Sequence, residues 1–230
     1  MKRNVLLAAA TASGALLLMS AAQADPLISI GLQEAGVNGG AITTVASGTG
    51  AAGVFNLSYG TFTANNISGI GNPPLANPSV LDSSSMNVAA DATGTLTVYV
   101  SETGITAPAP TGLAEFISAF TENMLMGPIT VTESTYLDAA NGLYALTTPL
   151  GGTTFPPLPI GQPVVQTATA DAGAGPYSVT AVYQIAASGV GSDNATIDVS
   201  VPEPASLALF GTALLGLAWF DRRRRGRPAG

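Results

Sequence analysis

Alternation of apolar and polar residues dominates the middle of the chain. Short segments rich in Val, Ile, Thr, Tyr and Phe lie between turn residues, a pattern typical of β-strands. The segments expected to form strands are 27–32, 41–47, 54–63, 86–90, 95–102, 129–135, 142–148, 164–170, 177–186 and 196–201. Many short strands at this spacing indicate an antiparallel β sandwich.

Turn residues and prolines divide these segments. Residues 91–94 are expected to close a hairpin between strands 86–90 and 95–102, and 141–142 and 171–176 are further turn signals. Two stretches that contain several prolines, 65–82 and 149–163, are expected to be long loops, since proline cannot donate a hydrogen bond to a sheet.

One segment suggests a different periodicity. Apolar residues recur at helical spacing after residues 111–112, and residues 127–128, Gly and Pro, end the run. The apolar positions are Leu113, Phe116, Ile117, Phe120 and Met124. The spacing predicts a short amphipathic helix over 112–125 that packs its apolar stripe against a sheet. The expected fold class is therefore mainly β, an antiparallel sandwich-like domain with one short helix.

Charge is distributed unevenly along the chain. All seven basic residues lie at the two ends, and residues 25–202 contain no Lys, Arg, His or Cys. The same stretch carries twelve acids: Asp25, Glu34, Asp82, Asp91, Glu102, Glu115, Glu122, Glu133, Asp138, Asp171, Asp193 and Asp198. Without cations the body cannot neutralise phosphates, so nucleic-acid binding is excluded. Without His or Cys it lacks the usual triads and the preferred ligands of zinc and copper.

The first 24 residues have the organisation of a secretory signal peptide. Lys2 and Arg3 form the charged start, and residues 5–19 form an apolar run. Ala22 and Ala24 place small residues at both positions that a signal peptidase requires, so we expect cleavage between Ala24 and Asp25. The alternative is an uncleaved anchor helix.

The C-terminal end combines three features. Pro202, Glu203 and Pro204 favour an extended peptide accessible to a processing enzyme. Residues 205–220 are uncharged and would span about 24 Å as a helix at 1.5 Å per residue. The basic block Arg222, Arg223, Arg224 and Arg225 would stop transfer and hold the tail in the cytoplasm. A C-terminal transmembrane helix is therefore expected.

This ordered combination resembles the PEP-CTERM sorting signal of Gram-negative bacteria. By that resemblance, residues 202–204 are recognised by an exosortase-type membrane enzyme, and the arginines are the stop-transfer block. The expected organisation is a signal peptide at 1–24, an acidic extracytoplasmic domain at 25–200 and a sorting and anchor segment at 201–230. The body would then lie in the periplasm, at the cell surface or outside the cell, with a transient or permanent inner-membrane anchor. A plain single-span membrane protein with a proline-rich stalk is the alternative.

Candidate chemistry in the body is limited to carboxylates. A glycosidase would need two of them about 5 to 10 Å apart in a cleft, and Glu102, Glu115 and Glu133 are the nearest candidates. The body has no Trp, which sugar sites commonly use, so no enzymatic activity and no cofactor are expected. Residues 193–198 gather oxygens but lack the spacing of a calcium loop, so no metal site is assigned.

The remaining interpretation is structural. The resemblance implies a cell-surface or extracellular-matrix protein associated with biofilm, whose partners are signal peptidase and an exosortase-type enzyme. Extracellular polysaccharide or divalent cations are further candidate partners of an acidic domain. An adhesin-like module that binds glycan or calcium is the alternative, and a glycosidase is a distant third.

Overall fold

A computed structural model describes residues 26–106, 112–157 and 163–202. The predicted signal peptide, Glu203 and Pro204, the C-terminal helix and the arginine block lie outside these residues. Within the described ranges, no helix is long and apolar enough to cross a membrane.

The described residues form strands joined by short connections, with a single 3-10 turn, η1, at Asn38–Gly40. The strands are β1 (Leu27–Glu34), β2 (Thr43–Thr49), β3 (Ala51–Tyr59), β4 (Phe62–Gly71), β5 (Ser79–Ala90), β6 (Gly94–Ile105), β7 (Leu113–Met126), β8 (Ile129–Asp138), β9 (Thr148–Phe155), β10 (Val164–Asp171), β11 (Tyr177–Ala187) and β12 (Gly191–Ser200).

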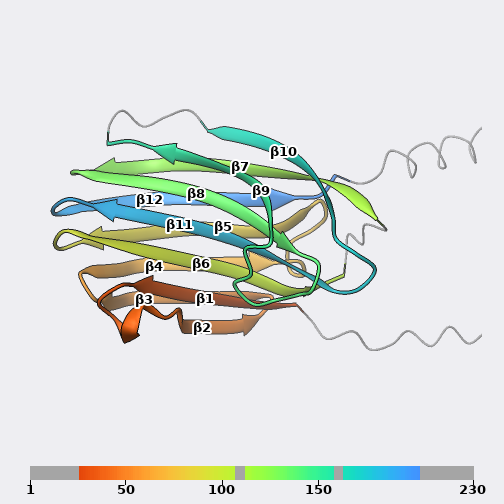
Figure 1. Ribbon diagram of the computed structural model, residues 1–230, viewed down its shortest axis with the longest axis horizontal. Coiled ribbons are helices and arrows are strands. Elements are labelled where there is room, and N and C mark those ends of the chain that lie inside the picture. Colours follow the sequence, from red (N-terminus) through yellow and green to blue (C-terminus); the bar gives the residue numbers. More distant parts are fainter. Residues whose placement is uncertain (1–25, 107–111, 158–162, 203–230) are drawn as a thin grey trace, which may run out of the picture.

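These strands form two antiparallel sheets of six strands each. The first has the order β2-β1-β6-β11-β8-β9 and the second β10-β7-β12-β5-β4-β3. The sheets lie face to face, with their strands running roughly along the same axis (Figure 1). The predicted β sandwich is confirmed, and its side chains alternate between an enclosed interior and the solvent.

Connections gather at the two ends of the sandwich. One end carries η1 and the turns around Gly60, Thr93, Pro128 and Gly189. The described chain begins and finishes at the opposite end (Figure 1). We call the first the distal end and the second the terminal end. The sorting segment therefore follows directly from the terminal end, and the distal end faces away from it.

The predicted helix over 112–125 is wrong. This segment is strand β7, hydrogen-bonded between β10 and β12. Phe116, Ser118 and Phe120 are buried while the residues between them are half-buried, which is the two-residue period of a strand. Phe116 and Phe120 are four residues apart, a spacing that a helix and a strand both place on one face. Leu113, which the helical pattern also needs, is 74% exposed.

Four other segments also differ from expectation. The proposed loop 65–82 is mostly strand, because β4 continues to Gly71 and β5 starts at Ser79. Residues 149–163 contain most of β9, which tolerates Pro149 because β9 is an edge strand. Segment 142–148 is mainly a connection between β8 and β9, and 54–63 is two strands that turn at Gly60.

The predicted hairpin at 91–94 is also wrong. The turn joins β5 to β6, and these strands belong to different sheets. Several other short connections also cross from one sheet to the other, including those between β7 and β8 and between β11 and β12. A tight turn therefore does not imply pairing of its neighbours in this chain.

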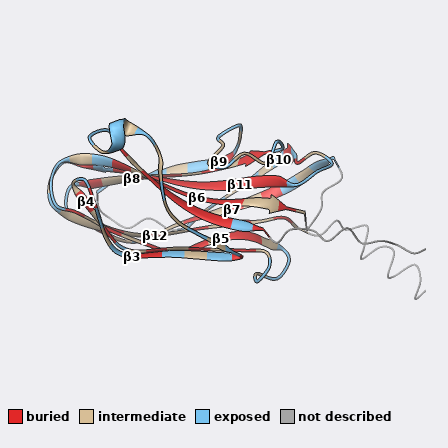
Figure 2. Cartoon of the chain, turned by 90° about the horizontal axis from the view of Figure 1, so that it is seen from below, coloured by how far each residue is buried: buried red, intermediate tan, exposed pale blue. Residues whose placement is uncertain are grey.

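Apolar side chains fill most of the space between the sheets, where buried residues concentrate (Figure 2). Phe116 of β7 packs edge-on against Tyr177 of β11, with ring centroids 6.2 Å apart. At one edge of the sandwich, the Gln166 side chain of β10 donates to the carbonyl of Gly152 in β9 at 2.8 Å and accepts from its amide at 3.0 Å. The side-chain amide of Gln166 therefore links β9 and β10, which are edge strands of different sheets.

Candidate functional site

The three glutamates considered for a glycosidase are not gathered in one cleft. Glu102 on β6 and Glu133 on β8 are both fully buried, whereas Glu115 on β7 is exposed. Glu102 pairs with Val179 of β11, and Glu133 pairs with Tyr183 of the same strand. The two carboxyl-bearing positions are thus four residues apart along the sheet, about 13 Å, and about 10 Å apart across it. That separation exceeds the reach of a carboxylate dyad.

Glu102 lies inside the sandwich near its terminal end. Its Oε1 accepts a hydrogen bond from the Asn72 amide at 3.0 Å, and its Oε2 has no partner. A side chain at Gly71 would collide with this carboxyl, so a glycine is required beside it. Burial raises the pKa of Glu102 to about 8, opposed in part by the Asn72 hydrogen bond. The nearby Tyr177 hydroxyl is buried and also has no partner.

A second group of carboxyls lies between the sheets. Glu122 on β7 and Asp193 on β12 belong to one sheet, and Glu133 on β8 belongs to the other. Their exposed fractions are 2%, 0% and 0%, so none is open to a substrate. We call these three residues the interior acidic cluster.

Most oxygens of the interior acidic cluster have no donor. Both oxygens of Glu133 and both of Asp193 are buried without a hydrogen-bond partner, as is Oε2 of Glu122. The Met124 amide contacts Oε1 of Glu122 at 3.3 Å. Glu122 and Asp193 lie within hydrogen-bonding reach of each other. Because carboxylates only accept, this contact is a hydrogen bond only when one of the two carries a proton.

The environment of the cluster shifts all three acids toward the protonated form. Burial raises the pKa of Glu122 to about 7, and the contact with Asp193 opposes that rise. Burial and then repulsion by Glu122 raise the pKa of Glu133 to about 9. Burial, followed by repulsion from Glu122, raises the pKa of Asp193 to about 10. The charged form of each is disfavoured because no cation offsets the loss of hydration.

Neutral polar contacts beside the cluster join the two sheets. The Tyr183 hydroxyl of β11 donates to Ser83 Oγ of β5 at 2.8 Å. Ser118 of β7 and Thr135 of β8 share a hydrogen bond of 2.7 Å between their hydroxyls. All four side chains are buried, so the centre of the sandwich contains a polar seam as well as an apolar core.

The oxygen-rich segment 193–198 does not form one binding site. Strand alternation turns Asp193 into the interior and leaves Asp198 half-buried on the outer face of β12. Asp198 lies opposite Asp82 of β5, and burial followed by repulsion from Asp82 raises the Asp198 pKa. Among the described residues, no group of three or more acids, histidines or cysteines is arranged to hold a metal ion.

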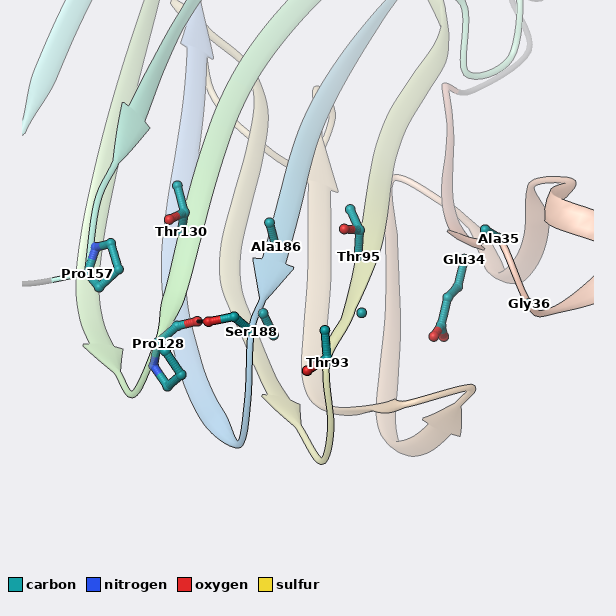
Figure 3. A pocket seen from close by; sticks show the side chains of 12 residues that line it. Glu34, Ala35, Gly36, Thr93, Thr95, Pro128, Thr130, Pro157, Ala186 and Ser188 are labelled. Atoms are coloured by element: carbon teal, nitrogen blue, oxygen red, sulfur yellow. Dashed lines mark hydrogen bonds between the residues drawn. The ribbon is translucent and has the colours of Figure 1, made fainter.

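An open pocket of about 550 Å³ lies at the distal end. Thr95, Ala186 and Thr130 lie in register across β6, β11 and β8, and they line it together with Pro128 and Pro157 (Figure 3). Glu34, which also contributes to the lining, already accepts hydrogen bonds from the Thr61 hydroxyl at 2.7 Å and from the Thr61 amide. The groups that remain available to a ligand are therefore mainly hydroxyls and proline rings.

Sequence reasoning did not single out Glu122, Tyr183 or the pocket residues. Glu122 belonged to the segment expected to be a helix, which hid its position at an interior site of β7. A signal was present for Glu133, since it interrupts apolar residues at alternate positions of its strand. The pocket residues come from separate connections, and no local pattern brings them together.

The fold and the charge pattern define an acidic β-sandwich domain followed by a C-terminal sorting segment. The family model of the PEP-CTERM protein-sorting motif matches residues 200–224. Residues 200–224 therefore carry a PEP-CTERM protein-sorting motif, which is consistent with an exosortase substrate and implies export with membrane-associated sorting through the C-terminal region. The match contains Pro202, Glu203, Pro204 and the first three arginines of the block, whose individual roles stay predictions.

The remaining comparisons concern solved structures. The enzymatically active domain of bacteriophage CBA120 tailspike protein 4 is 12% identical with a TM-score of 0.32, over 62% of this chain and 19% of that one. The adhesin domain of Epf from Streptococcus pyogenes is 10% identical with a TM-score of 0.33, over 76% of this chain and 57% of that one. The chain thus spans about a fifth of the tailspike structure and somewhat over half of the adhesin structure. No curated protein matches the chain.

Proposed function

We propose that the domain is a structural component of the cell surface or extracellular matrix, associated with biofilm, and that it performs no catalysis. The observation that supports this proposal is the placement of its acids. In the described residues, Glu122, Glu133 and Asp193 are enclosed, the pair Asp82 and Asp198 lies half-buried on an outer face, and Glu115, Asp91 and Asp171 are exposed singly. No cation accompanies them, because residues 25–202 contain no Lys, Arg or His. Such a surface keeps the domain soluble by self-repulsion and attracts divalent cations of a polysaccharide matrix.

The test begins with the intact mass of the protein recovered from cell fractions. A species that starts at Asp25, ends near Pro204 and lies on the surface or in the medium is expected. Glu203→Ala should block sorting and leave a species that keeps its arginines in the inner membrane, whereas the control Glu115→Ala should be sorted normally. Loss of the arginines despite Glu203→Ala would contradict the assigned role of Glu203.

The structural role itself is tested by deletion. A strain without this chain should retain less polysaccharide and aggregate less, and re-expression of the wild-type chain should restore both. Re-expression of Glu203→Ala should not restore them, because the domain would stay in the inner membrane. Unchanged surface, aggregation and polysaccharide retention in the deletion strain would refute the proposed role.

The second candidate function is glycan binding at the distal pocket. The observation that favours it is position: the pocket lies at the end of the sandwich opposite the origin of the sorting segment. A domain tethered through that segment would present the pocket outward. Hydroxyl groups of Thr95 and Thr130 would offer hydrogen bonds to a sugar, whereas the Ser188 hydroxyl already donates to the Pro128 carbonyl at 3.3 Å.

A glycan array with and without calcium separates the two functions. A passive matrix protein should show no saturable ligand. If the pocket binds glycan, Ala186→Tyr should abolish the signal by filling it, while Gln184→Tyr should not. Gln184 is a matched control because it is also exposed on β11 but lies outside the pocket lining. An equal loss of glycan signal with Ala186→Tyr and Gln184→Tyr would mean that the glycan binds outside this pocket.

A further inference from the structure

The interior acidic cluster brings three carboxyls together where the two sheets face each other. Glu122 and Asp193 project from neighbouring strands of one sheet, offset by a bulge in β7. Glu133 projects from β8 of the opposite sheet and is fully buried with neither oxygen hydrogen-bonded. The cluster therefore lies across the interface that holds the sandwich together, and its charge state acts on both sheets.

Few groups could neutralise this charge. The chain supplies no Lys, Arg or His between residues 25 and 202, so an ion pair is impossible within the domain. The described residues also contain no arrangement of three or more acids suited to a metal ion. Ionised carboxylates without a cation are strongly disfavoured in an enclosed, apolar setting. Protons are the remaining counter-charge.

We propose that Glu122, Glu133 and Asp193 form a pH-sensitive contact between the two sheets, which holds the sheets together while the carboxyls are protonated. With protons bound, the carboxyls are neutral, Glu122 and Asp193 can share a hydrogen bond, and the sheets close over them. When protons are lost in alkaline surroundings, the carboxylates repel one another across the interface and the sandwich loosens. The domain then responds to the pH outside the cell.

The neighbouring groups reinforce this behaviour. Among the described residues packed around the cluster, β11 contributes one titratable side chain, Tyr183, whose pKa is raised by burial and by Glu133. The facing strand β5 contributes Ser83, while its acid Asp82 points to the outer face. Glu102 of β6 lies farther along the sheet and titrates on its own. None of the described residues is basic, so no basic side chain faces the cluster from the strands described.

The direction of the pH effect follows from linkage. Below the usual carboxyl pKa, about 4, the folded and unfolded chains both hold these protons. Above it, the unfolded chain releases them while the folded chain retains them up to pH values of about 7, 9 and 10 for Glu122, Glu133 and Asp193. Stability therefore falls as pH rises through this window. The unfolding constant increases about tenfold per pH unit for each retained proton.

Equilibrium denaturant unfolding of the purified full-length chain between pH 5 and pH 9 tests the proposal. The parent should lose stability steeply, with an unfolding constant that rises by roughly a thousandfold per pH unit near neutrality, because Glu133, Asp193 and Glu102 each retain a proton there. The triple variant Glu122→Gln, Glu133→Gln, Asp193→Asn should retain only about a tenfold rise per unit, which Glu102 supplies. Glu115→Gln, an exposed change on β7, should behave like the parent.

Two further measurements keep the test decisive even if the triple variant does not fold. Infrared spectra of the parent near pH 7 should contain the carbonyl band of protonated carboxyl groups, and the band should disappear as pH rises toward 10. Absence of that band at neutral pH would overturn the proposal. It would also fail if calcium stabilised the parent at pH 7 and a chelator reversed the effect, because the counter-charge would then be a cation.

Discussion

Replacing Tyr183 with Phe removes one oxygen from the centre of the sandwich and should destabilise the domain by about 2 kcal/mol. Tyr183 has no exposed surface, and its hydroxyl donates across the interface to Ser83 Oγ at 2.8 Å. A weaker contact of 3.3 Å joins it to the Ser83 carbonyl. The ring itself is retained, so the loss comes from polar groups left unpaired, which cost about 1 to 3 kcal/mol when buried.

The partner substitution should be cheaper, and the two should not add. In Ser83→Ala the Tyr183 hydroxyl can still turn to the Ser83 carbonyl, so we expect a loss of about 1 kcal/mol. In a chain that already carries Tyr183→Phe, removing the Ser83 hydroxyl eliminates an unpaired group and should cost almost nothing. The double variant should therefore be about 1 kcal/mol more stable than the sum of the single losses predicts.

Denaturant unfolding at pH 6 provides the assay, because the interior acids are largely protonated there. The slope of the free energy against denaturant should be the same for all variants, so that midpoints report stability. Tyr136→Phe is the matched control, since Tyr136 is half-buried on the outer side of β8 and should lose less than 0.5 kcal/mol. The hydrogen bond would be refuted as the source of the effect if the destabilisation of the double variant equalled the sum of those of Tyr183→Phe and Ser83→Ala within about 0.3 kcal/mol.

Three other changes test separate parts of the structure. Gln166→Ala should cost about 1 kcal/mol and speed amide exchange at Gly152, because the two hydrogen bonds that join β9 and β10 are lost; unchanged exchange would argue against that contact. Glu102→Gln should raise stability far more at pH 9 than at pH 5, since the folded-state pKa of Glu102, about 8, is raised; an equal change of the unfolding midpoint at both pH values would contradict this. Asp138→Ala should weaken the loop after β8, where Asp138 accepts from the Gly142 amide at 2.7 Å. Because this hydrogen bond lowers the Asp138 pKa, the parent's advantage should be lost as pH falls below 4, and thermal unfolding at pH 7 and pH 3 would measure it.

The sequence predicted the fold class well because strand alternation is a local property. Segments such as β8, where buried and half-buried residues alternate over almost the whole strand, are visible in the chain alone. The failure at β7 has a definite cause. Phe116 and Phe120 satisfy two periods at once, and the polar residues Ser118 and Glu122 at the other interior positions concealed the period of two.

Pairing between strands was much harder to predict. The turn at 91–93 suggested a hairpin, yet it carries the chain from one sheet to the other. Which sheet a strand joins depends on partners far away in the sequence, such as β1 with β6 and β11 with β8. A similar limit applied to the cluster, since Glu122 and Glu133 meet only after β7 and β8 are placed in opposite sheets.

The missing basic residues and the buried acids are connected by one physical requirement. A domain without Lys, Arg or His cannot offset a buried carboxylate with an ion pair, so an interior acid is tolerated only in its neutral form. Glu102, Glu122, Glu133 and Asp193 therefore impose a dependence on external pH that a domain with basic partners would avoid. A cytoplasmic protein would gain little from this dependence, because its surroundings are buffered. The proposed placement of the domain outside the cell would expose it to the pH of its surroundings, and there the same acids can change the domain's stability.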